Sequence, residues 1–306
     1  MPSEEWSALR ETFAACAPKA VAATMAAVTA VDPEIDLGGA EQLYGLTKEP
    51  TGVTYEEGTA AGLAAIWANP LGCDTERVVV YLHGGGFISG SKESHRKLAA
   101  HLAKAAGVRA VIPDYRLAPV HPFPAQLDDA RALFGWLLAE GHEPSKIALA
   151  GDSAGGNIAT AAALALGRSG GARPGAVVAF SPWYDMEANG PTFESNAAVD
   201  VAISRELVHT FAPMFLGGQS PAEPLANPLY SDPAGLPPLL LTCGGDETLL
   251  DSVERFAALA RRSGVEVALH VADGMPHVYQ LLAGRMPEAD ASIAEAGKWL
   301  RDRLGG

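Results

Sequence analysis

The chain has 306 residues and a formal net charge of −14, a length that suits one large α/β domain or two small ones. The acidic balance argues against nucleic-acid binding, which needs a basic face. Cys16, Cys73 and Cys243 are widely spaced and lack paired cysteine or histidine spacings, which argues against a disulfide framework or a zinc site and favours reduced thiols.

The N-terminal segment has the pattern of packed helices. Its first residues are acidic where a signal peptide would be basic. The Ala- and Val-rich stretch 13–31 is interrupted by Pro18 and Lys19, so we do not expect it to span a membrane. We predict two helices over residues 3–31, broken near Pro18, then a loop over 32–52, in a cytoplasmic protein.

Strand and helix patterns alternate through the next hundred residues. Residues 77–82 are an apolar, β-branched run typical of a buried strand, and they lead directly into His83-Gly84-Gly85-Gly86-Phe87. The proline-rich stretch 114–124 is incompatible with regular structure. We expect further strands at 59–68 and 108–113, and helices at 92–106 and 125–139.

A serine motif stands between the next strand and the next helix. An apolar run ends in Gly151-Asp152-Ser153-Ala154-Gly155, and an Ala-rich helical pattern continues to about residue 166. A nucleophile elbow has this order, because the serine occupies strained backbone and small residues must flank it. The pentapeptide alone is a weak signal, and its strand–turn–helix context strengthens it.

The remaining chain continues the alternation with one interruption. We expect strands at 176–180, 237–243 and 265–271 and helices at 248–263 and 286–304, which implies a mostly parallel sheet covered on both faces. Residues 184–237 are too long for a simple connection and contain one good helix, 204–215. An insert of this kind is usually a lid or a binding element.

The acid and the base of a catalytic triad are expected after the serine, because α/β hydrolases order them Ser, Asp or Glu, His. Asp246 follows the strand that ends at Cys243, and we choose it as the acid over its competitors Glu247 and Asp251. Asp251 falls in the following helix.

Only two histidines follow Asp246 in the chain, His270 and His277. His270 lies inside a predicted strand and is expected to be a strand-face residue. His277 lies past that strand in a turn, 31 residues after Asp246, where a loop can carry it over the sheet edge. We therefore predict His277 as the base.

The glycine triplet after the strand 77–82 is a candidate oxyanion hole. Glycines leave backbone N–H groups free to approach a ligand closely. The donors that we expect are the N–H groups of Gly85, Gly86 and Ala154, the last being the residue after the nucleophile. His83, Gly84 and Asp152 are expected to support these motifs.

These motifs together resemble the bacterial hormone-sensitive-lipase-like esterases, from about residue 60 onward. The resemblance rests on His83-Gly-Gly-Gly-Phe87, Asp114-Tyr-Arg-Leu-Ala-Pro119, His121-Pro-Phe-Pro-Ala125, Gly151-Asp-Ser-Ala-Gly-Gly-Asn157 and Asp273-Gly-Met-Pro-His277. It implies an α/β-hydrolase fold with a mostly parallel, twisted sheet of about eight strands, helices on both faces and a helical cap. The implied cap comprises residues 1–45 and 184–235, and the core comprises 46–183 and 236–306.

Two positions depart from the family pattern. Val120 stands where the family usually has Glu. The chain reads Asp246-Glu-Thr-Leu-Leu-Asp251-Ser252 where the family often has Asp-Pro-Leu-x-Asp-Glu, and the first Asp is retained. The loss of Glu at 252 is expected to change the support of the acid loop.

The expected activity is hydrolysis of short-to-medium acyl esters through Ser153, His277 and Asp246, without a metal or an organic cofactor. We expect Phe87, Tyr184, Phe211, Met214 and Phe215 to line the substrate pocket. The resemblance of residues 273–284 to monoterpene ε-lactone hydrolases leaves a lactonase open, and an amidase could use the same residues.

A catalytically silent ligand-binding protein is the alternative from another class, because the plant gibberellin receptor resembles this fold without the catalytic histidine. The expected partners are small ester or lactone substrates, with no nucleic acid and no membrane. Family members often pair through an edge strand, so a homodimer is a further expectation.

Overall fold

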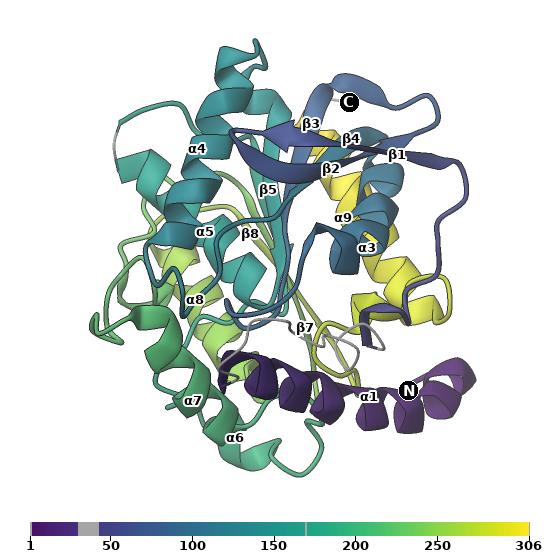
Figure 1. Ribbon diagram of the computed structural model, residues 1–306, viewed down its shortest axis with the longest axis vertical. Coiled ribbons are helices and arrows are strands. Elements are labelled where there is room, and N and C mark those ends of the chain that lie inside the picture. The colour runs from purple at the N-terminus through teal and green to yellow at the C-terminus, as the bar shows by residue number, and fades with distance from the viewer. Residues whose placement is uncertain (1, 30–42, 169, 306) are drawn as a thin grey trace.

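A single eight-stranded sheet runs through the protein in the order β1-β2-β4-β3-β5-β6-β7-β8 (Figure 1). The computed structural model describes residues 2–29, 43–168 and 170–305. The strands are β1 (Val53–Ala60), β2 (Leu63–Pro70), β3 (Asp74–Leu82), β4 (Val108–Pro113), β5 (Ile147–Asp152), β6 (Ala176–Phe180), β7 (Leu239–Gly244) and β8 (Val267–Ala272). The β1–β2 and β2–β4 pairs are antiparallel and all others are parallel. The predicted fold class is confirmed.

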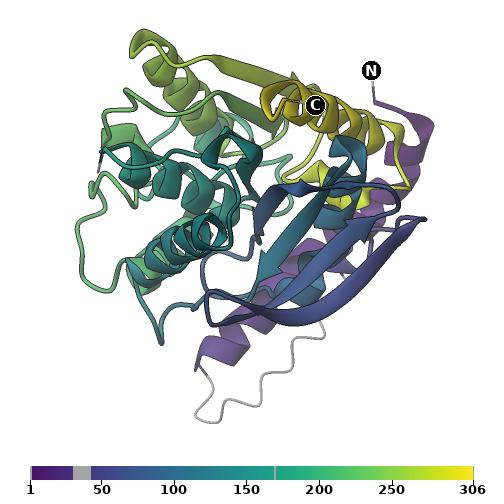
Figure 2. The same cartoon turned by 90° about the horizontal axis from the view of Figure 1, so that it is seen from above.

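Helices cover both faces of the sheet, so the central strands β5, β6 and β7 are buried along their whole length. The helices α3 (Lys92–Ala106) and α9 (Pro287–Arg303) pack on one face. The helices α4 (Ala125–Ala139), α5 (Ala154–Arg168) and α8 (Leu250–Arg262) pack on the other. Figure 2 shows the two layers from above. Short 3₁₀ turns lie at Pro144–Lys146, Pro228–Tyr230 and Tyr279–Leu282.

The N-terminal segment is one helix, α1 (Glu4–Thr29), and the predicted break near Pro18 is wrong. An internal proline costs a backbone hydrogen bond. Here the helix buries Trp6 and Phe13 before Pro18 and Ala20 after it, and this burial favours a continuous helix. Residues 30 and 31 of the prediction, and most of the predicted loop over 32–52, lie outside the described residues.

The predicted single strand over 59–68 is also wrong, because the chain reverses inside it. The strands β1 and β2 form a hairpin whose turn is Ala61-Gly62, with φ of 52° and 81°. Two residues of positive φ are the usual geometry of a tight hairpin. Alanine seldom adopts that geometry, so a turn at Ala61 was not expected from the sequence.

The insert between β6 and β7 contains two helices, α6 (Thr192–Ser195) and α7 (Arg205–Leu216). The hydroxyl of Ser204 accepts a hydrogen bond from Leu207 N at 3.2 Å and caps α7. The other predicted helices and strands agree with the structure within three residues at either end. None of the helices formed by the described residues is long and apolar enough to cross a bilayer.

Figure 1 shows α1, α6 and α7 gathered at one end of the sheet. Trp6 on α1 donates its indole N–H to the carbonyl oxygen of Gly274 at 3.0 Å, just after β8 ends. The loops that follow the parallel strands at this edge of the sheet carry the side chains of the candidate active site.

Candidate active site

Ser153 stands at the sharp turn between β5 and α5, with φ of 50°. A non-glycine residue with positive φ is strained, as a nucleophile elbow requires. Ser153 N donates to Phe180 O at 2.8 Å, which ties the turn to β6. A side chain on Gly155 would overlap the carbonyl oxygen of Leu82, so the close crossing of α5 and β3 depends on glycine there.

His277 reaches Ser153 from the loop after β8. Its Nε2 lies 3.0 Å from Ser153 Oγ. The next residue, Val278, has φ of 48°, and its N–H donates to Ser181 Oγ at 3.0 Å. The loop is thereby fixed to the end of β6, and the imidazole is 9 % exposed. The predicted serine–histidine contact is present in the structure.

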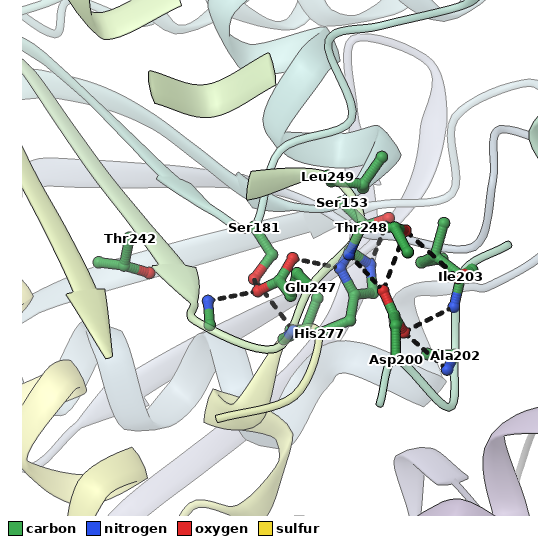
Figure 3. A network of polar contacts seen from close by, with 12 residues as sticks. Ser153, Ser181, Asp200, Ala202, Ile203, Thr242, Glu247, Thr248, Leu249 and His277 are labelled. Atoms are coloured by element: carbon green, nitrogen blue, oxygen red, sulfur yellow. Dashed lines mark hydrogen bonds and ion pairs between the residues drawn. The ribbon is translucent and has the colours of Figure 1, made fainter. Parts of the chain in front are cut away.

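The carboxylate that contacts His277 belongs to Glu247, and the prediction of Asp246 for this position is contradicted (Figure 3). Glu247 Oε2 lies 2.8 Å from His277 Nδ1. The cause is the path of the chain after β7. Gly244 and Gly245 pack against the backbone of residues 272–276: a Cβ on Gly244 would overlap the carbonyl oxygen of Met275, and one on Gly245 would lie a tight 3.2 Å from Ala272 O. The loop then turns at Glu247, whose N–H bonds back to Gly244 O.

Glu247 is fully buried and its second oxygen is also occupied. Oε1 accepts hydrogen bonds from Gly244 N and from the hydroxyl of Ser181, each at 2.5 Å. Three donors therefore surround one carboxylate. This arrangement fixes the orientation of the carboxylate toward the imidazole.

The electrostatic surroundings favour the charged form of His277. Burial lowers the pKa of His277, but the adjacent charge and hydrogen bond of Glu247 raise it, with smaller contributions from Asp200 and Asp152. The balance leaves the pKa above its ordinary value. An imidazole of raised pKa accepts a proton more readily from a neighbouring hydroxyl.

The rejected candidates have other surroundings. Asp246 is half-buried, and burial followed by the nearby charges of Asp273 and Asp200 raises its pKa, although Arg10 opposes this. Asp251 pairs with Arg255 within α8, with Oδ2 and Nε 2.5 Å apart. His270 is a β8 side chain whose Nδ1 lies 3.0 Å from Glu295 Oε2, in agreement with its predicted strand-face position.

The glycine triplet lies beside the serine. Gly85 and Gly86 have φ of 117° and 64°, a region that glycine adopts at little cost. Both residues line the same cavity as Ser153 and His277. A Cβ on Gly86 would lie 2.6 Å from the ring of Phe211 on α7, so the triplet also lets the inserted helix approach closely.

A cluster of buried polar side chains makes hydrogen bonds to the glycine triplet. Asp152 Oδ1 accepts from Gly84 N at 3.2 Å and from the hydroxyl of Tyr81 at 2.9 Å. His83 Nδ1 lies 2.8 Å from Gly84 O, and its ring stacks on Tyr115 with centroids 4.2 Å apart. Burial, reinforced by the nearby imidazole of His95, lowers the pKa of His83 to about 3. The neutral His83 is thus a structural support.

A cavity of about 90 Å³ opens beside Ser153 and His277. Its walls come from α1, α7 and several loops: Phe13, Ala17, Ala20, Val21 and Thr24 on α1, Leu207 and Phe211 on α7, and Leu43, Tyr44, Ser89, Trp183, Ala202, Ile203, Val278 and Leu281. The apolar residues of α1 were missing from the predicted pocket. Their helical spacing indicates a buried face but does not show which surface that face covers.

Of the predicted pocket residues, only Phe211 lines this cavity. The rings of Phe87 and Phe215 stack at 3.7 Å between centroids and fill the space beneath α7. Tyr184 packs on Phe256 and bonds to Thr160 Oγ1. Met214 packs against the core. These large side chains are needed to fill the core under the insert, which removes them from the cavity wall.

No metal-type grouping of three His, Cys, Asp or Glu side chains occurs in residues 2–29, 43–168 and 170–305. The cavity is lined by the hydroxyl of Ser153, the imidazole of His277 and the backbone of Gly85 and Gly86, and the buried carboxylate of Glu247 contacts the imidazole. This set suits acyl transfer.

Comparison with known proteins gives a consistent result. A family model described as alpha/beta hydrolase fold matches residues 79–281. An acetyl-hydrolase from Streptomyces hygroscopicus is 35 % identical over 266 residues, covering 87 % of this chain and 88 % of the relative.

Solved structures resemble the chain over almost its whole length. A crystal structure of an esterase from the bacterial hormone-sensitive lipase family is 41 % identical, with a TM-score of 0.91 and 100 % of both chains covered. The structure of EstE5 soaked with p-nitrophenyl butyrate is 30 % identical, with a TM-score of 0.87, and covers 99 % of this chain and 100 % of that chain. The chain therefore belongs to the α/β-hydrolase fold family and, within it, to the carboxylic ester hydrolases of the bacterial hormone-sensitive-lipase type.

Proposed function

We propose that the protein is a serine carboxylesterase that uses Ser153, His277 and Glu247 to hydrolyse short-to-medium acyl esters through an acyl-enzyme. The single observation that carries this proposal is the hydrogen-bonded chain from Ser153 Oγ through His277 to Glu247 Oε2 at the wall of an apolar cavity. A nucleophile, a base and an orienting carboxylate in this order are the minimum for covalent acyl transfer.

The proposed reaction has two halves. His277 Nε2 takes the proton of Ser153 as Oγ attacks the ester carbonyl carbon, and then gives that proton to the departing alkoxide, which leaves as the alcohol. Water next attacks the acyl-enzyme, transferring one proton through His277 to Ser153 Oγ as the carboxylic acid is released. Glu247 holds Nδ1 protonated and stabilises the imidazolium that forms in each half.

The N–H groups of Gly85, Gly86 and Ala154 are the proposed donors to the oxyanion of both tetrahedral intermediates. Gly85 and Gly86 have no side chain to obstruct the cavity that they line with Ser153. Each such donor contributes on the order of 3 kcal/mol to the lowering of the barrier.

The proposed preference for short-to-medium acyl chains rests on the modest cavity of about 90 Å³ and its apolar walls from α1 and α7. Two similar proteins point the same way: one is named an acetyl-hydrolase, and another was soaked with p-nitrophenyl butyrate.

The reduced state of Cys16, Cys73 and Cys243, which form no disulfide, is compatible with the expected cytoplasmic setting.

A p-nitrophenyl ester series from acetate to palmitate, with Ser153→Ala as the blank, tests the proposal. We expect the highest kcat/KM at or below octanoate and background rates for the blank. A maximum at palmitate contradicts the proposed chain length, and an active Ser153→Ala variant contradicts the mechanism.

Two alternatives are outcomes of the same experiment. ε-Lactones measured in parallel would reveal a lactone hydrolase if they exceed every linear ester in kcat/KM. A fluorophosphonate probe detects an activated serine independently of substrate. Absence of a covalent adduct on Ser153 would establish a silent binding protein instead.

A further inference from the structure

The inserted segment 192–203 makes several hydrogen bonds to the loop that carries Glu247. Three polar side chains spaced four residues apart, Thr192, Asn196 and Asp200, all contact residues 245–251. We refer to these three residues as the clasp. Asn196 Nδ2 donates to Gly245 O at 3.0 Å and to Glu247 O at 2.9 Å.

Asp200 is the charged member of the clasp and makes the most contacts (Figure 3). Its Oδ2 accepts from Thr248 N at 2.7 Å and from the Thr248 hydroxyl at 3.0 Å. Its Oδ1 accepts from Ala202 N and Ile203 N, each at 2.9 Å. The Asp200 carboxylate therefore bonds both to Thr248, the residue after Glu247, and to Ala202 and Ile203, which are among the residues that line the substrate cavity.

We propose that Asp200 is a positioning residue, which connects the cavity wall at Ala202 and Ile203 to the loop that carries Glu247 and adds a second negative charge near His277. This inference rests on the proposed function, because it takes Glu247 and His277 as members of the triad. The insert therefore supports the catalytic carboxylate from one side while its other side bounds the cavity.

The charged groups around His277 define what Asp200 can change. Glu247 is in contact, Asp200 and Asp152 act from further away, and all three raise the pKa of His277 against the lowering effect of burial. Asp246 lies in the same loop as Glu247, and the charges of Asp273 and Arg10 act on Asp246 from nearby. Removal of the Asp200 charge therefore lowers the pKa of His277, and the acid limb of the pH profile should move to lower pH.

Geometry and charge can be separated with two variants of the clasp in the full-length protein. Asp200→Asn removes the charge and keeps one acceptor oxygen, so two of its donors face an amide NH₂. Asn196→Ala removes support for the loop without changing the charge. Asp232→Asn is the matched control, because Asp232 is exposed in the same insert and, within the described residues, its side chain accepts only from Ala234 N.

The measurements are kcat and KM for p-nitrophenyl butyrate, the pH dependence of fluorophosphonate labelling, and Tm. We expect Asp200→Asn to lower kcat about ten-fold, because charge-assisted hydrogen bonds become neutral ones. KM should change less than kcat, and the acid limb of the labelling profile should move to lower pH. Asn196→Ala should lower kcat with the acid limb unmoved. Asp232→Asn should match the wild type.

Three results overturn the inference. The first is a wild-type kcat and acid limb in Asp200→Asn. The second is the same acid-limb shift in Asp232→Asn. The third is a wild-type kcat in Asn196→Ala, and it decides the case if Asp200→Asn does not fold. A wild-type protein whose Ser153 is not labelled refutes the proposed function, whereas normal wild-type labelling with an unaltered Asp200→Asn refutes this inference alone.

Discussion

The substitution Glu247→Gln tests the triad most directly. The carboxylate accepts from Gly244 N and Ser181 Oγ at one oxygen and faces His277 Nδ1 with the other. An amide has only one acceptor oxygen. If that oxygen stays with Gly244 and Ser181, the NH₂ group faces Nδ1 and favours the tautomer protonated at Nε2, which cannot accept the proton of Ser153.

The expected loss is large because the wrong tautomer and the missing charge act together. Replacing the carboxylate of a catalytic triad by its amide lowers kcat by about 10⁴-fold in a serine protease, so we expect a fall of about 10³ to 10⁴-fold here, or about 4 to 5.5 kcal/mol of barrier. Kinetics with p-nitrophenyl butyrate measure kcat, and urea unfolding shows whether the variant is folded.

Asp246→Asn is the matched control, one residue away and with the same change of charge. Asp246 makes no side-chain hydrogen bond to the described part of the chain, so kcat should stay within about two-fold of wild type. Its raised pKa means that the folded state disfavours the ionised form, and the neutral Asn should therefore raise the free energy of unfolding slightly at neutral pH. A folded Glu247→Gln within ten-fold of wild type, or a greater loss in Asp246→Asn, would refute the reasoning.

Three further predictions follow from the same structure. The acid limb of kcat/KM should lie above the ordinary histidine pKa of about 6.5, because His277 must be neutral to act and its pKa is raised; a midpoint below that value contradicts the electrostatic argument. Ala20→Leu, which extends into the cavity, should lower kcat/KM for octanoate relative to acetate about ten-fold or more, whereas Ala15→Leu on the exposed face of α1 should leave the ratio unchanged. Gly155→Ala should lower the free energy of unfolding in urea by about 3 kcal/mol or more through overlap with backbone, whereas Gly135→Ala, which meets no atom within 4 Å, should stabilise α4 by about 0.5–1 kcal/mol.

Local signals predicted much of the fold. Apolar β-branched runs and helical spacing placed most elements within three residues, because burial on a sheet or helix face imposes a period on the sequence. The strand–turn–helix context identified Ser153, and a turn after the last strand identified His277. These signals are local, so no tertiary information was needed to find the two residues.

The same signals failed where a local rule competed with packing. Pro18 indicated a break, yet burial on both sides keeps α1 continuous. Ala61 gave no sign of a turn, yet pairing of β1 with β2 holds it at positive φ. The apolar residues of α7 were expected in the pocket, although most of them fill the core beneath the insert.

Chain order and strand ends were therefore enough to predict that Ser153 and His277 would meet above a parallel sheet, but they led to Asp246 as the acid, which the structure contradicts. Which carboxylate contacts the imidazole depends on packing between distant parts of the chain. Asp246 and Glu247 are neighbours, and the choice depends on how Gly244 and Gly245 pack against the loop of His277. The wall of the cavity was likewise decided by where α1 lies, since a helix pattern shows a buried face but not its partner.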